Sequence, residues 1–105
     1  MSAPQHPRHH LVDLLTHPVR FSLVAALNAT DTVEFGVVRD VLQISDSVLS
    51  RQVSALEDAG LVRVKKGYVG KRPRTWLALT ADGKSQWATH LQALRVIAEG
   101  AHSAP

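Results

Sequence analysis

The sequence predicts a single, mainly α-helical domain with a small β-hairpin, in the element order α-α-β-α-α-β-β-α. Apolar residues recur at helical spacing in most segments, two β-branched segments flank a glycine-containing stretch, and 105 residues allow only one domain. We expect the domain to span residues 9–99, with residues 1–8 and 100–105 as flexible tails.

Four helices and one short strand are predicted for the N-terminal half of the domain. Apolar residues recur there at helical spacing, and proline and serine stand where helices begin. The β-prone residues 32–35 are expected to form the short strand. The expected helices cover residues 9–16, 18–28, 37–42 and 46–59.

The C-terminal half is predicted to form a β-hairpin followed by a long helix. Residues 61–66 and 75–80 are β-branched and partly alternating, as strands are, whereas residues 67–74 contain two glycines and a proline and favour a loop. Thr80 is a suitable N-cap for the last helix, which extends to about Glu99.

A short helix, a tight connection of about three residues and a helix capped by Ser45 together form a helix-turn-helix unit. The hairpin that follows has the position of a wing. The predicted fold class is therefore mainly α with a small β wing, a winged helix-turn-helix.

Positive charge is concentrated in the predicted hairpin. The formal net charge is only +3, yet residues 61–75 contain no Asp or Glu. Such a block favours contact with a polyanion, although a solvated face that keeps the protein soluble gives the same pattern. The cations of the block are Arg63, Lys65, Lys66, Lys71, Arg72 and Arg74.

What the sequence lacks disfavours several kinds of function and location. The absence of cysteine excludes disulfides and thiolate chemistry and fits a reducing cytoplasm. Residues 1–10 have no signal-peptide core, and no apolar run approaches the ~18 residues that span a membrane. His6, His9 and His10 form a crude cluster in a predicted tail, where no rigid helix or Glu partner supports a zinc site, and no catalytic motif is present. We expect a cytoplasmic protein that is not an enzyme and has no cofactor, metal or membrane partner.

Several segments resemble winged-helix transcriptional regulators of the MarR, ArsR and PadR type. Residues 13–27 are similar to the opening of ArsR and PadR proteins, and residues 49–62 to the end of the recognition helix in MarR and ArsR proteins. Residues 66–76 and 79–83 resemble the wing and last-helix start of compact stand-alone members. The wing has Lys71-Arg72-Pro73-Arg74 where MarR proteins usually carry an Asp-x-Arg pair. The resemblance implies a DNA-binding regulator that works as a homodimer.

Two groups of residues are predicted to contact double-stranded DNA. Small hydroxyl side chains on the helix over residues 46–59 allow close approach to a major groove, and Arg51 can bind a guanine edge. Cations of the wing over residues 65–74 suit phosphates or a minor groove. Tyr68 could pack on the hairpin or contact DNA, and packing is the favoured role. The predicted contacts are Ser45, Ser47, Ser50, Arg51, Ser54, Lys65, Lys66, Lys71, Arg72 and Arg74, with Gln52 less favoured.

A homodimer interface is predicted along the last helix, where apolar residues form a narrow seam. The same side chains could instead pack on the core of their own chain. The predicted interface residues are Leu11, Leu14, Leu15, Trp87, Leu91 and Leu94. His17 is expected to cap or pack locally, and His90 lies close enough to the seam to make it sensitive to pH.

Two further hypotheses stand beside the leading one, which is a dimeric repressor that reads a palindromic operator. A winged helix can also serve as a protein-interaction module without binding DNA itself. A ligand-responsive switch would need its small-molecule or protein effector at the dimer interface, near Trp87 or His90.

Overall fold

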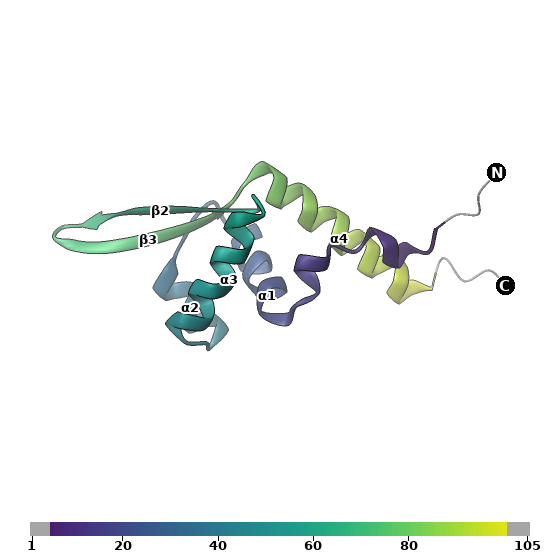
Figure 1. Ribbon diagram of the computed structural model, residues 1–105, viewed down its shortest axis with the longest axis horizontal. Coiled ribbons are helices and arrows are strands. Elements are labelled where there is room, and N and C mark those ends of the chain that lie inside the picture. Colours follow the sequence, from purple (N-terminus) through teal and green to yellow (C-terminus); the bar gives the residue numbers. More distant parts are fainter. Residues whose placement is uncertain (1–4, 101–105) are drawn as a thin grey trace.

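The computed structural model describes residues 5–100 as an elongated molecule of 62 × 25 × 21 Å, with a β-hairpin at one end and the last helix at the other (Figure 1). The fold is a winged helix, as predicted. Its elements are the 3₁₀ helices η1 (Pro7–His10) and η2 (Asp13–Thr16), the helices α1 (Pro18–Asn28), α2 (Phe35–Leu42), α3 (Asp46–Asp58) and α4 (Ala81–Glu99), and the strands β1 (Val33–Glu34), β2 (Val62–Val69) and β3 (Arg72–Leu79).

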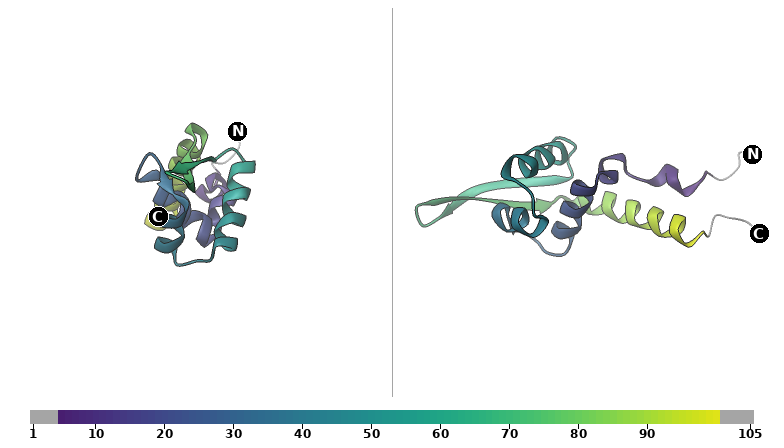
Figure 2. Two further views of the ribbon diagram at one scale, coloured as in Figure 1. Left: turned by 90° about the vertical axis from the view of Figure 1, so that its left-hand side faces the viewer. Right: turned by 90° about the horizontal axis from the view of Figure 1, so that it is seen from below.

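The N-terminal segment differs from its prediction. In place of a helix over residues 9–16 there are two 3₁₀ helices, because Leu11 and Val12 are extended, with ψ of 142° and 113°. The Val12 N–H donates to Nδ1 of His90 at 2.9 Å, so a distant residue takes the donor that a continuous helix would use. Pro7 and Arg8 belong to η1, which packs beside α4 (Figure 2), so the predicted tail is wrong for these residues. Residues 1–4 and 101–105 of the predicted tails lie outside the described residues.

The core lies where α1, α3 and the sheet meet. Leu23 of α1, Leu49 and Leu56 of α3 and Leu77 of β3 are fully buried there. Arg20 connects the surrounding elements, since its Nε donates to the Leu14 carbonyl at 2.6 Å and its Nη1 to Oε1 of Gln52 at 3.0 Å. The predicted local role of His17 is confirmed, because its Nδ1 accepts from the Val19 N–H at the start of α1.

The sheet has three antiparallel strands in the order β1-β3-β2, with Val33 of β1 paired to Leu77 at the base of β3. The loop predicted over residues 67–74 is wrong, because the strands continue to a turn at Gly70 and Lys71. Gly70 has a φ of 63°, which suits the first position of a tight hairpin turn. Pro73 is tolerated in β3 because its partner is Tyr68, in the second residue pair from the turn. The two residues of this pair do not exchange hydrogen bonds, so the missing N–H of proline leaves no bond unmade.

The junction between the hairpin and α4 is tightly packed. The Thr80 hydroxyl donates to the Gly60 carbonyl at 2.6 Å, and the Gly83 N–H donates to the same hydroxyl at 2.9 Å, so Thr80 caps α4 as predicted. A Cβ on Gly83 would clash with the Leu61 carbonyl oxygen. Only glycine therefore lets α4 begin so close to the start of β2.

The turn between α2 and α3 contains a non-glycine residue in the left-handed region. Gln43 has φ 56° and ψ 47°, and its N–H donates to the Arg39 and Asp40 carbonyls to end α2. A side chain in this conformation costs about 1–2 kcal/mol, which glycine avoids.

Substitution of Gln43 tests this strain. We expect Gln43→Gly to raise the free energy of unfolding by about 1 kcal/mol and Gln43→Asn by less. Gln43→Val should lower it, because a β-branched side chain tolerates positive φ poorly. Urea denaturation measures the series, and equal stabilities of the Gly and Val variants would contradict the assigned backbone.

Candidate nucleic-acid interface

Helix α3 presents a polar face to solvent because its apolar stripe is buried. Leu49, Val53 and Leu56 point into the core, and the side chains of Ser47, Ser50, Arg51 and Ser54 are exposed on other sides of the helix. Gln52 is buried, and its Oε1 accepts from Arg20, so the less favoured contact is directed away from solvent. The polar face that the sequence places on this helix is therefore open for contact.

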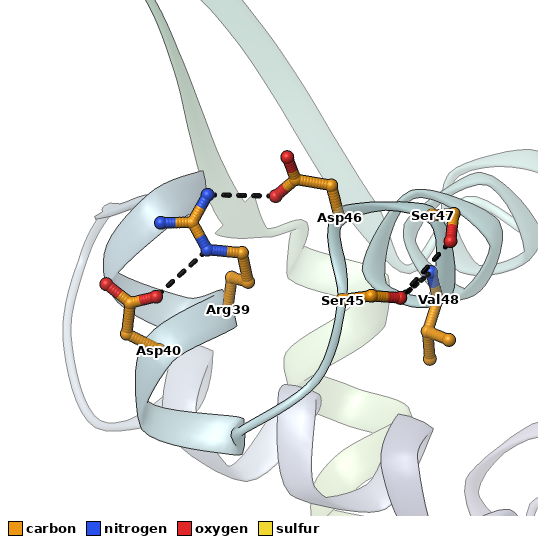
Figure 3. A network of polar contacts seen from close by, with 6 residues as sticks. All are labelled: Arg39, Asp40, Ser45, Asp46, Ser47 and Val48. Atoms are coloured by element: carbon orange, nitrogen blue, oxygen red, sulfur yellow. Dashed lines mark hydrogen bonds and ion pairs between the residues drawn. The ribbon is translucent and has the colours of Figure 1, made fainter.

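Ser45 is exposed and is also the N-cap of α3. Its Oγ accepts from the Val48 N–H at 3.2 Å and lies 3.1 Å from Oγ of Ser47 (Figure 3). The cap satisfies one of the free N–H groups in the first turn of α3. Any contact that Ser45 makes with a ligand must coexist with this cap.

An arginine bridges the two helices of the helix-turn-helix unit. Arg39 of α2 donates from Nε to Oδ1 of Asp40 and from Nη1 to Oδ1 of Asp46, both at 2.9 Å (Figure 3). These two hydrogen bonds raise the pKa of Arg39 above its ordinary value, and the bond that Asp40 accepts has the larger effect. The guanidinium is therefore a permanent cation at the start of α3.

The wing divides its cations between two faces. Residues paired across an antiparallel ladder share a face, and successive residues alternate. Lys66, paired with Thr75, lies on the face toward α3, whereas Lys65 and Arg74 lie on the opposite face with Trp76. Arg72 shares that second face, and Lys71 stands in the turn. The single basic block of the sequence is thus divided unevenly: Lys66 faces α3, and the other strand cations lie on the opposite face.

Arg74 differs from the other predicted contacts in the wing. Its Nε lies 3.2 Å from Oε1 of Glu34, and its side chain is only about one-third exposed. Glu34 reaches it because β1 pairs with the base of β3. Lys65, Lys66, Lys71 and Arg72 are exposed, and within residues 5–100 they form no ion pair.

A groove of about 420 Å³ separates α3 from the wing. Ser50 and Ser54 line it from the helix and Lys66 from the strand, so the structure brings these predicted contacts together. Asp46 and Glu57 also line it, which makes its charge mixed. Arg51 and Lys65 are not among the residues that line this groove.

Two side chains at the wing tip are exposed although neither is among the favoured contacts. Tyr68 is 73% exposed and Val69 is 56% exposed, so the expected packing of Tyr68 on the hairpin is wrong. Continuation of the strand alternation beyond Lys66 would have placed Tyr68 on the α3 side of the wing, next to the cations.

The predicted dimer seam is split between core and surface. Leu15 and Trp87 are buried in the core of the single chain, and the Trp87 ring lies 5.0 Å from that of Phe21. These two residues therefore do not offer a surface to a second copy. The other four predicted interface residues are half-buried and remain accessible: Leu11, Leu14, Leu91 and Leu94.

The fold and this surface define a winged helix-turn-helix DNA-binding protein. Residues 19–98 match the model of the winged helix DNA-binding domain family, and the chain belongs to that family. The resemblance noted in the sequence is thus confirmed at the level of this family. Within the described residues, no helix is long and apolar enough to cross a membrane.

Proteins from other organisms share this fold. A transcriptional regulator homologue from Pyrococcus horikoshii is 27% identical, with a TM-score of 0.79 over 84% of this chain and 87% of that chain. An uncharacterized protein of Methanocaldococcus jannaschii is 26% identical over 73 residues, which is 70% of this chain and 79% of that protein. The regulator MosR of M. tuberculosis, solved with DNA, is 21% identical and has a TM-score of 0.69 over 93% of this chain and 71% of its own.

His90 generates a prediction about pH. It is 2% exposed, and its Nδ1 accepts the Val12 N–H, an arrangement that requires an unprotonated Nδ1. Burial lowers the pKa of His90 from its ordinary value of 6.5, and a hydrogen bond with the backbone of Leu15 opposes the shift only in part. Because the unfolded chain then binds protons more readily, stability is complete above about pH 6.5 and falls as the pH drops below it.

The variant His90→Asn tests this dependence, since the amide oxygen can accept the same N–H and does not titrate between about pH 5 and 8. Urea unfolding at about pH 7.5 and 5.5 should show a larger loss of stability for the parent protein than for the variant. Parallel losses in both proteins would contradict the role of His90.

Proposed function

We propose that this protein is a dimeric transcriptional repressor that reads a palindromic operator in double-stranded DNA. The observation that carries the proposal is the common groove between α3 and the wing, bordered by Ser50, Ser54 and Lys66. A helix with small polar side chains beside a cationic hairpin fits a duplex whose grooves and phosphates it can contact together.

The contacts divide by chemistry. The first turns of α3 enter the major groove, where Ser47 and Ser50 come close to the bases and Arg51 binds the O6 and N7 atoms of a guanine. The wing extends along the backbone, with Lys71 and Arg72 at its tip on phosphates or in the adjacent minor groove. Arg74 contributes less than these two, because Glu34 already neutralises it.

The dimer forms through α4 and the segment beside it. Leu11, Leu14, Leu91 and Leu94 are half-buried apolar residues of the N-terminal segment and of α4, and α4 extends away from the wing (Figure 1). Pairing of two copies at this end would leave both α3 helices exposed. Two recognition helices about one helical turn apart would then read two half-sites.

A protein-interaction module is the second candidate, and one observation favours it. Val37 and Val41 of α2 are 51% and 66% exposed and lie one helical turn apart. Scattered exposed apolar residues are normal on protein surfaces, however, and an interaction module needs no acid-free wing.

Arginine substitutions test DNA recognition. Arg72→Ala should weaken binding to every duplex and lower the slope of log affinity against log salt by about one. Arg51→Ala should relax preference at one base pair, at a cost of about 1–3 kcal/mol on the preferred site. Gel shifts on duplexes selected from a random pool measure both effects. Failure of the parent protein to bind any duplex would instead favour the interaction module.

A charge placed in the apolar seam tests the dimer. We expect the parent protein to sediment as a dimer and Leu94→Glu as a monomer, with operator affinity reduced by about 100-fold because two linked half-site contacts become one. Val41→Glu on the distant α2 serves as the matched control and should remain dimeric. A parent protein that sediments as a monomer would overturn this part of the proposal.

A further inference from the structure

The two helices of the helix-turn-helix unit are joined by few direct contacts. Among residues 5–100, the bond from Arg39 to Asp46 is the only side-chain hydrogen bond or ion pair between α2 and α3. The connection itself is a turn through Gln43, which is strained by its positive φ. Each helix packs on α1, so the bond between Arg39 and Asp46 is what ties them directly to each other.

The position of this pair makes it relevant to DNA binding. Asp46 is the first residue of α3 and lines the groove toward the wing, so a small rotation of this end moves Ser47 and Ser50 relative to a base edge. Displacements of about 1 Å are enough to lose well-oriented contacts.

We propose that Arg39 and Asp46 form a clamp that fixes the pose of α3, so that Arg39 is a positioning residue for sequence recognition. The inference rests on the proposed DNA-binding function. Arg39 is suited to this task because its planar guanidinium holds Asp40 with one nitrogen and Asp46 with another. Asp40 therefore keeps the guanidinium in place on α2, and the second hydrogen bond, to Asp46, connects it to α3.

The clamp predicts one effect that the two substitutions share and one in which they differ. Loss of the clamp by either substitution lowers the ratio of operator affinity to nonspecific affinity. Loss of charge has opposite effects on nonspecific binding, because Arg39→Met removes a cation and Asp46→Ala removes an anion near the phosphates. A residue that merely contacted a phosphate would change nonspecific affinity and leave the ratio unchanged.

The experiment is a double-mutant cycle on the full chain, with a duplex selected by the parent protein and a scrambled duplex of equal length. We expect Arg39→Met and Asp46→Ala each to lower the affinity ratio by about 1.5- to 5-fold, the range of an exposed ion pair. The double variant should be no worse than either single variant. On scrambled DNA, Arg39→Met should bind more weakly than the parent and Asp46→Ala more tightly.

Two controls make the cycle decisive. Asp40→Asn removes the charge beside Arg39 but keeps an amide oxygen that can accept from Nε, and it leaves the bond to α3 in place. Glu57→Gln removes a groove acid that forms no ion pair within residues 5–100. Both should keep the parent ratio. Additive losses in the double variant, or an equal loss in Asp40→Asn, would overturn the clamp. A random pool that yields no enriched duplex would instead overturn the proposed function itself.

Discussion

The structure depends on the burial of one apolar stripe on α3. Leu49 and Leu56 are fully buried and Val53 nearly so, and they meet Leu23 of α1 and Leu77 of β3 in the same core. Burial of these side chains leaves no rotation of α3 in which its serines face inward. Because β3 contributes to that core, the base of the wing is held by the packing that orients α3. Both elements of the candidate interface thus share one rigid support.

Sequence reasoning succeeded where local chemistry determines structure. The caps Ser45 and Thr80, the apolar spacing of α3 and the cationic hairpin are all readable within a few residues. It failed where a residue far away in the sequence determines the local backbone conformation. The N-terminal segment is broken because Val12 donates to His90, 78 residues away. The glycines and the proline of residues 67–74 favour a loop, but the structure continues both strands through most of this stretch. Pro73 is compatible with the strand because its position in the ladder needs no N–H donor.

The sequence allows the residues of the candidate site to be proposed, but it does not give their geometry. A run of cations in sequence does not reveal how strand alternation separates Lys65 from Lys66, or that Glu34 comes to Arg74 through the pairing of β1. The structure shows acids paired with Arg74 in the middle of the wing and with Arg39 at the start of α3, whereas the exposed Lys65, Lys66, Lys71 and Arg72 form no ion pair within residues 5–100. A duplex that met the wing would therefore meet mainly the positive charge of these four residues.

His90 joins the two segments that would form the proposed dimer face. Leu11 and Leu14 lie on either side of Val12, whose N–H is bound to His90, whereas Leu91 and Leu94 follow His90 on α4. The bond between Val12 and His90, together with the packing of η1 on α4, holds the N-terminal segment against α4. Protonation of His90 would weaken that attachment, which includes no residue of the wing or of α3. Acid should therefore act first on pairing of the two copies and reach DNA affinity only through the loss of the second recognition helix.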